Sequence, residues 1–194
     1  MTRQHHDTHQ VRIIGGMYRR TPLAVIDRPG LRPTPDRVRE TLFNWLGQDL
    51  RGWRCLDAFA GCGALGFEAA SRGAASVIMI KRDPQAFAQL QRMRTRLAAD
   101  GVTLVKGDAL VQLQQMEPAS LDVVFLDPPF DSAVWDAALA GAARAVTATG
   151  WVYLESPECW SGERLRPFGL ETHRDLKAGA VHAHLLRHRQ AGLG

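Results

Sequence analysis

The tetrapeptide Asp127-Pro128-Pro129-Phe130 has the clearest chemical potential in the sequence. It ends an apolar run, and because two consecutive prolines cannot continue a strand ladder, the chain must turn at Asp127. The turn then holds a carboxylate, the carbonyls around Pro128 and an aromatic ring in one stiff cluster. An amine on a heteroaromatic ring needs this set: two acceptors hold its protons and steer the nitrogen lone pair out of conjugation, while Phe130 stacks on the ring. We therefore predict Asp127, Pro128 and Phe130 as catalytic residues; a purely structural turn is the alternative.

A second feature is the glycine-containing loop in residues 56–66, LDAFAGCGALG. It places Asp57 at the carboxyl end of an expected strand, then Gly61 and Gly63, then a helix. Open α/β sheets bind ligands at this edge, and glycines let the backbone approach a ligand closely. Asp57 could hold a ligand ammonium, and amide groups at the helix start could hold a carboxylate. The loop lacks the Lys-Ser/Thr of a P-loop and the third glycine of a dinucleotide fold. A plain strand–helix turn is the alternative.

The segments around these two features alternate between strand-like and helix-like patterns. Strands are expected at 53–59, 76–80, 102–108, 121–127 and 151–155, with helices at 34–46, 64–73, 83–99 and 132–146 and a short one after 108. Thr34, Asp83 and Ser132 are expected to cap three of the helices. At the C-terminus, the pattern indicates two strands that form a hairpin with a turn at residues 177–179. The alternation predicts right-handed crossovers and one mostly parallel α/β sheet, covered on both faces.

Length and composition fit one compact domain with a short appendage: 194 residues, 45% of them hydrophobic. We expect a basic arm and helix in residues 1–50 and the main domain in 51–194. There is no apolar run long enough for a membrane span and no apolar core of a signal peptide, so we expect a cytoplasmic protein that does not contact membranes. Nothing in the sequence demands more than a monomer.

The cysteine and histidine pattern does not predict a metal site. Cys55, Cys62 and Cys159 form no CxxC pair, so neither a disulfide framework nor a zinc site is indicated. His182 and His184 lie on one face of an expected strand, but the sequence offers no third ligand beside them. We therefore expect no metal and treat both as ordinary strand histidines.

Positive charge is concentrated at the N-terminus. Residues 1–40 contain eight arginines and four acidic residues, an excess equal to the whole net charge of +4. A basic arm on a near-neutral body suggests a surface that contacts phosphates. A solvated tail is the alternative.

The two chemical features together carry a family resemblance. The segment LDAFAGCGALGFEAASRGA followed by DPPF resembles the amino-methyltransferase branch of the class I S-adenosylmethionine-dependent methyltransferases. With RIIGGMYRR and GLRPTPDRVRETLFNWL upstream, residues 11–155 resemble the bacterial RsmD-like family, which methylates N2 of one guanine in small-subunit (16S) ribosomal RNA. The resemblance implies a Rossmann-like, doubly wound, seven-stranded sheet with an antiparallel last strand. It also implies S-adenosyl-L-methionine as cofactor, and ribosomal RNA or the assembling small subunit as partner.

The resemblance also implies roles for individual residues. The cofactor would be bound by Asp57, Ala58, Phe59, Gly61, Gly63, Lys81, Arg82, Asp108, Ala109 and Asp127. The segment from Arg32 to Arg39 would close over the cofactor, and RNA would be contacted by Arg12, Arg19, Arg20, Arg32, Arg37 and Arg39.

Lys81 departs from the family pattern, which has an acidic residue there that holds both ribose hydroxyls. A lysine has only donors, and the lost pair of hydrogen bonds would weaken binding by about 1–3 kcal/mol. Asp83 could compensate, although we expect it to cap a helix.

Several alternatives stay open. One is another amino-methyltransferase, acting on DNA, RNA or protein glutamine. A different class is a non-catalytic RNA-binding ribosome-assembly factor with a weakened cofactor site. A nucleotide-binding oxidoreductase is disfavoured by the missing third glycine.

Overall fold

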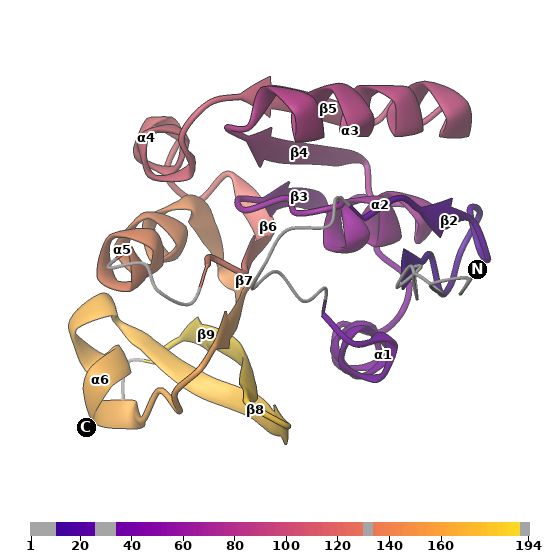
Figure 1. Cartoon of the computed structure of the whole chain (residues 1–194). Helices are drawn as coiled ribbons and strands as arrows, with labels where there is room; N and C mark the ends of the chain where they lie inside the picture. The colour runs from indigo at the N-terminus through magenta and orange to yellow at the C-terminus, as the bar shows by residue number, and fades with distance from the viewer. Residues whose placement is uncertain (1–10, 26–33, 130–133, 191–194) are drawn as a thin grey trace, which may run out of the picture.

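The alternating segments fold into a central sheet flanked by helices in the computed structural model, which describes residues 11–25, 34–129 and 134–190 (Figure 1). The sheet strands are β3 (Arg54–Asp57), β4 (Ser76–Lys81), β5 (Val102–Lys106), β6 (Leu121–Leu126), β7 (Val146–Ser156), β8 (Leu170–Ala178) and β9 (Val181–His188). The helices are α1 (Asp36–Trp45), α2 (Ala64–Ser71), α3 (Pro84–Leu97), α4 (Ala109–Gln115), α5 (Trp135–Ala145) and α6 (Gly162–Leu165), followed by a 3₁₀ turn, η1 (Arg166–Phe168).

The strand order is β5-β4-β3-β6-β7-β9-β8. Strands β3 to β7 are parallel to one another, and β9 runs antiparallel to both β7 and β8. The predicted seven-stranded, mostly parallel sheet with an antiparallel last strand is therefore confirmed. From β3 the chain winds outward to β4 and β5, then returns to β6 and winds the other way. The β3–β6 pair is thus the topological switch point, where such folds bind ligands.

Two hydrophobic clusters cover the two faces of the sheet. On one face, side chains of α1, α2 and α3 pack around Phe67, Phe125 and Tyr153. On the other, α4, α5 and α6 pack around Val124, Leu139 and Trp160. Figure 1 shows α1 and α2 on one side of the strands and α4 and α5 on the other. The central strand β6 is buried on both faces and is almost continuously apolar, as is typical of parallel strands.

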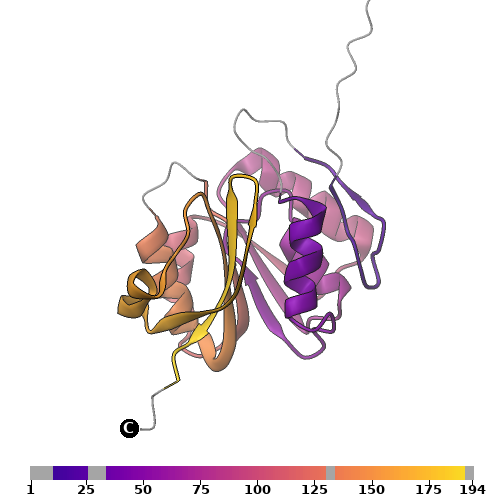
Figure 2. The same ribbon diagram turned by 90° about the horizontal axis from the view of Figure 1, so that it is seen from below.

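The N-terminal segment packs on the first of these faces. Strands β1 (Val11–Arg12) and β2 (Pro22–Leu23) pair antiparallel beside the main sheet, as Figure 2 shows in indigo. Val11, Ile13 and Leu23 are at most 4% exposed and belong to the same cluster as the sheet residues. The segment therefore shares the core of the domain from which the sequence analysis set it apart.

The helix caps agree with the sequence in one case and differ in another. Asp83 Oδ1 accepts from the amide of Ala86 at 2.8 Å, so the predicted cap of α3 is confirmed. The predicted Thr34 cap of α1 is wrong, because Pro35 is the N-cap residue and receives no side-chain bond. The hydroxyl of Thr34 donates instead to Glu155, near the carboxyl end of β7. Ser132 lies outside the described residues.

The observed ends of the strands differ slightly from the predicted ends. Strand β7 begins five residues before the predicted strand, and the final hairpin turns at residues 179–180, where Gly179 has a φ of +62°. Over the described part of the chain, there is no helix both long and apolar enough to cross a membrane.

Candidate functional site

The two predicted chemical features meet at one edge of the sheet. Strands β3 and β6 are parallel neighbours, with Leu56 opposite Val124 and Asp57 opposite Phe125. The amide of Ala58 donates to the carbonyl of Phe125 at 3.1 Å and extends this ladder by one step. Asp57 ends β3 and Asp127 directly follows β6, so both carboxylates lie at the switch point. The glycine loop and the Asp-Pro-Pro turn therefore follow neighbouring strands at one edge of the sheet.

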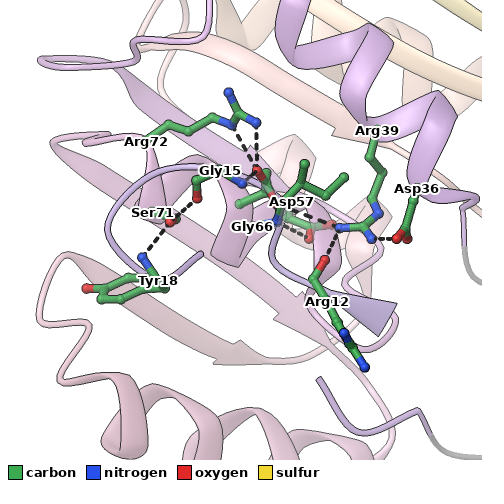
Figure 3. A network of polar contacts seen from close by, with 11 residues as sticks. Arg12, Gly15, Tyr18, Asp36, Arg39, Asp57, Gly66, Ser71 and Arg72 are labelled. Atoms are coloured by element: carbon green, nitrogen blue, oxygen red, sulfur yellow. Dashed lines mark hydrogen bonds and ion pairs between the residues drawn. The ribbon is translucent and has the colours of Figure 1, made fainter. Parts of the chain in front are cut away.

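Asp57 is built into the start of α2. Its side chain is buried, and Oδ2 accepts from the amide of Gly66 at 3.0 Å (Figure 3). Burial raises the pKa of Asp57 to about 7, although the amides of Gly66 and Phe59 and the charge of Lys81 act in the opposite direction. The carboxyl is therefore fixed in position and takes up a proton near neutral pH.

The two glycines of the loop differ in what requires them. Gly63 is the N-cap of α2, with a φ of +84°, and a Cβ there would lie 2.7 Å from the Phe67 ring. Its conformation and its packing both exclude a side chain. A Cβ at Gly61 would have no described atom within 4 Å. The fold therefore explains Gly63, whereas Gly61 leaves space along the loop for another molecule.

Asp127 belongs to a buried polar cluster that the sequence analysis did not predict. The hydroxyl of Thr34 donates to Glu155 Oε1 at 2.8 Å and lies 3.5 Å from Asp127 Oδ2. The hydroxyl of Tyr153 donates to the same Glu155 oxygen at 2.8 Å. Thr34, Tyr153 and Glu155 are all at most 6% exposed. Residues from the N-terminal segment and from β7 therefore hold the end of β6 in place.

Burial and neighbouring acids raise the proton affinity of Asp127. Burial raises the pKa of Asp127 well above its usual range, and repulsion from Glu155 and Asp57 adds to this. Burial also raises the pKa of Glu155, while the hydroxyls of Thr34 and Tyr153 lower it. Asp127 is consequently a much better proton acceptor than an exposed aspartate.

Lys81 supplies positive charge to the same edge. It is the last residue of β4 and is half-buried, and its charge lowers the pKa of both Asp57 and Asp127 against the larger effect of burial. Asp83 uses Oδ1 to cap α3, as described above, so this oxygen is committed to the helix.

The other predicted cofactor residues lie along this edge in different environments. Asp108 caps α4, because Oδ1 accepts from the amides of Leu110 and Val111 at 2.9 and 3.3 Å. Its Oδ2 lies 3.9 Å from the guanidinium of Arg82, whose side chain is 84% exposed. Ala58 and Ala109 are buried and Phe59 is half-buried. The helix cap accounts for an aspartate at position 108 without any ligand. The cap uses Oδ1 and leaves the other carboxylate oxygen toward solvent. Phe130 lies outside the described residues.

The N-terminal segment is clamped to α2 by a buried ionic network (Figure 3). Glu68 is fully buried and accepts from the amides of Ile14 and Gly15 at 2.7 and 2.8 Å. It also pairs with Arg72 at 2.8 Å and lies 3.7 Å from Arg39. Ser71, on the same helix, accepts from the amide of Tyr18 at 2.8 Å. These hydrogen bonds therefore join α2, which begins at the glycine loop, directly to the N-terminal segment.

Arg39 needs a correction as a predicted RNA contact. Its guanidinium is 0% exposed, donates to the carbonyl of Arg12 at 2.9 Å and pairs with Asp36 at 2.6 Å. A side chain held in this way cannot reach a phosphate, so Arg39 is a structural part of the clamp. The other predicted RNA contacts in the described residues are exposed: Arg12, Arg19, Arg20 and Arg37. Arg32 lies outside the described residues.

A signal for some of the missed residues was present in the sequence. Glu155 is an acid directly after an apolar run at a strand end, the same pattern that identified Asp57 and Asp127. Glu68 is the one acid in the otherwise apolar and small α2. For Thr34 there was no such signal, because its partner Glu155 lies 121 residues away.

The described residues also contain one group that could hold a metal ion: Cys159, His182 and His184. In the sequence, the two histidines have no third ligand beside them. The structure brings Cys159 to them from the loop after β7.

Comparisons with known proteins agree with this fold. A family model described as "Conserved hypothetical protein 95" matches residues 11–187. The Escherichia coli (strain K12) protein named "Ribosomal RNA small subunit methyltransferase D" is 40% identical over 193 residues, covering 96% of this chain and 94% of its own. The solved structure of Escherichia coli yhhF is 38% identical with a TM-score of 0.78, covering 94% of this chain and 99% of its own. A solved Haemophilus influenzae structure is 30% identical with a TM-score of 0.74, covering 93% and 99%.

Proposed function

Because this chain belongs to the family of the bacterial ribosomal RNA small subunit methyltransferase D proteins, we propose that it methylates the exocyclic N2 of a guanine in small-subunit ribosomal RNA, with S-adenosylmethionine as donor. The observation that carries the proposal is the juxtaposition of the glycine loop after β3 with the Asp-Pro-Pro turn after β6. The glycine loop suits a ligand that carries an ammonium and a carboxylate. The Asp-Pro-Pro turn suits an amine that is to be alkylated.

The residues at the switch point fit S-adenosylmethionine. The open side of Gly61 gives a ligand access to the loop backbone, and Asp57 offers a buried carboxylate for an ammonium group. The first turn of α2 offers backbone amides to a carboxylate. The other residues proposed to bind it are Ala58, Phe59, Gly63, Lys81, Arg82, Asp108, Ala109 and Asp127. When bound, the cofactor supplies an electrophilic methyl group on a sulfonium.

Asp127 and Pro128 are proposed to orient the target amine. The carboxylate of Asp127 and the carbonyl of Pro128 can each accept one proton of the NH₂ group, which turns the nitrogen lone pair away from the guanine ring. Phe130 is proposed to stack on that ring. Most of the rate enhancement would come from this positioning, because an unpositioned guanine amine is a poor nucleophile.

The raised pKa of Asp127 supports a further part in the reaction. A methylated N2 bears positive charge until it loses one of its protons. A carboxylate with a raised pKa stabilises that charge and can take the proton. Glu155, Tyr153 and Thr34 are proposed as positioning residues that hold Asp127 in this state.

The RNA contact is proposed for the exposed arginines of the N-terminal segment and α1. Arg12, Arg19, Arg20 and Arg37 are exposed, and Arg19 lines a cavity of about 480 Å³ between that segment and α1. A base inside a helix cannot reach Asp127, so the target guanine must lie in a loop or be flipped out of its helix.

Transfer of labelled methyl groups tests the proposal. The full chain is incubated with labelled S-adenosylmethionine and either protein-free ribosomal RNA, small-subunit particles, DNA or protein, and the methylated nucleosides are identified by mass spectrometry. We expect N2-methylguanosine from one of the ribosomal substrates. The Asp127→Ala variant should lose this activity and still bind the cofactor. Near-parental transfer by Asp127→Ala, or a product other than N2-methylguanosine, would refute the assignment.

A second candidate, a non-catalytic RNA-binding assembly factor, is favoured by one observation. Lys81 stands at the strand end where the family pattern has an acid, and a lysine cannot accept hydrogen bonds from ribose hydroxyls. Calorimetry with S-adenosylmethionine separates the candidates. Saturable binding to the parent chain supports the enzyme. Binding that arises only in Lys81→Glu supports the factor.

A further inference from the structure

Three side chains that commonly bind metal ions meet on the C-terminal half of the sheet. Cys159 lies in the loop between β7 and α6, and His182 and His184 lie two residues apart on β9. One possible ligand atom of each residue lies within 4.8 Å of those of the other two. The two imidazole rings are nearly parallel, with an interplanar angle of 11° and centroids 6.3 Å apart.

This cluster is separate from the methyltransferase site. In the β7–β9 ladder, Glu155 pairs with Ala183, while His182 and His184 pair with Ser156 and Leu154. Opposed residues of an antiparallel pair share a face, and neighbours along a strand alternate between faces. The histidines therefore lie on the sheet face opposite the Glu155 side chain.

His184 is a buried polar side chain without a full set of partners. It is 1% exposed, and its Nδ1 has no hydrogen-bond partner among the described residues. Its Nε2 accepts a long hydrogen bond of 3.4 Å from the amide of Trp160. Buried polar atoms are almost always paired, so an unpaired ring nitrogen beside a thiol and a second imidazole points to a ligand.

The loop that carries Cys159 is anchored on both sides. The carbonyl of Glu158 accepts from the hydroxyl of Ser156 at 2.5 Å, and the side chain of Trp160 is 2% exposed. The guanidinium of Arg164 lies 3.5 Å above the Trp160 ring. Cys159 itself is exposed, so its thiol is held near the histidines while one side stays open to solvent.

We propose that Cys159, His182 and His184 bind one divalent transition-metal ion of the zinc class, with solvent completing the coordination. Thiolate and imidazole are the ligands such ions prefer. Bond lengths of about 2.0–2.3 Å place tetrahedral ligand atoms about 3.3–3.7 Å apart, so a closing movement of about 1 Å suffices. On binding, the Cys159 thiol loses its proton to solvent, and the thiolate sulfur forms the metal bond. The ion would tie the loop after β7 to β9.

Cobalt and zinc titrations of the full chain test this site. In every protein tested, His5, His6 and His9 are replaced by Gln, because a histidine-rich N-terminus can bind metals by itself. Co²⁺ reports thiolate ligation through its charge-transfer absorption, and Zn²⁺ affinity is measured by competition with a chromophoric chelator. Cys159→Ser and His182→Asn each remove one ligand. His188→Asn removes an imidazole from the same strand and serves as the control.

We expect one Co²⁺ per chain with a thiolate absorption band, and displacement of it by Zn²⁺. Loss of a residue that hydrogen-bonds to a metal ligand weakens metal binding by roughly 10- to 100-fold, so loss of a direct ligand in Cys159→Ser or His182→Asn should weaken binding by more than about 100-fold. The His188→Asn variant should bind as the parent does. Absence of the thiolate band, or an equal band in Cys159→Ser, would overturn the proposal.

A second measurement needs no variant and so does not depend on variant folding. Zn²⁺ should protect Cys159 from alkylation by iodoacetamide, read by mass spectrometry of its peptide. Buried Cys55 provides the internal reference for unfolding. Equal alkylation of Cys159 with and without Zn²⁺ would refute metal binding there.

Discussion

Replacing Asp57 with Asn should change how stability depends on pH. Burial raises the pKa of Asp57 from 3.8 to about 7, so between these pH values the folded chain holds a proton that the unfolded chain has released. A group with a raised folded pKa contributes stability below its unfolded pKa and loses it as pH rises through the folded one. A shift of about three units at 1.36 kcal/mol each corresponds to about 4 kcal/mol lost between pH 4 and pH 8.

The Asn side chain keeps the shape of Asp57 and its acceptor for the Gly66 amide, but it cannot ionise. The stability of Asp57→Asn relative to the parent should therefore rise with pH, by about 1.4 kcal/mol per unit between pH 4 and 7. Urea unfolding followed by circular dichroism at half-unit pH intervals measures this difference. Asp100→Asn, at an exposed acid, shows what a surface charge change does by itself. A relative stability of Asp57→Asn that stays constant within about 1 kcal/mol across this range would refute the reasoning.

Three further outcomes are expected. Glu155→Gln keeps an acceptor for Thr34 and Tyr153 but removes the charge that raises the pKa of Asp127, so the acid limb of the methylation pH profile should move to lower pH; an unmoved limb contradicts this. Glu68→Gln should lower the free energy of unfolding by about 3–5 kcal/mol, because the Arg72 side chain, only 7% exposed, loses its carboxylate partner and Arg39 keeps only Asp36; urea unfolding checks this, and a loss below about 1 kcal/mol would contradict it. Gly63→Ala should destabilise the fold through its Cβ contact with Phe67, whereas Gly61→Ala should leave unfolding unchanged and weaken cofactor binding in calorimetry; the reverse pattern would show that the loop does not face the ligand.

Much of the fold could be predicted because the core strands carry local signals. Near-continuous apolar runs bounded by turns identified β3, β4, β5 and β6, and the Asp-Pro pair identified the start of α3. The strands β1 and β2 were missed because each is two residues long, too short to show any periodicity.

The sequence likewise predicts some residues of the candidate site and not others. Asp57 and Asp127 could be predicted because each follows its own strand, and parallel neighbours end at one edge. Thr34 and Arg39 were assigned to a cap and to an RNA contact because the sequence shows residue type but not the partner. Their partners, Glu155 and Glu68, come from distant segments, and only tertiary packing brings them together. For the same reason, the sequence did not show that Cys159 lies beside the two histidines of β9.

The separations within the polar clusters have a consequence for synthesis of the chain. The segment at Ile14 leaves the ribosome early, yet its partner Glu68 follows 54 residues later, so it must wait undocked during translation. Thr34 waits longer still, since Glu155 is 121 residues downstream. A nascent or prematurely terminated chain that lacks β7 therefore has the glycine loop and Thr34 but not the Glu155 carboxylate and the Tyr153 hydroxyl that complete the cluster around Asp127. Catalytic competence should arise late and abruptly, once nearly the whole polypeptide has emerged.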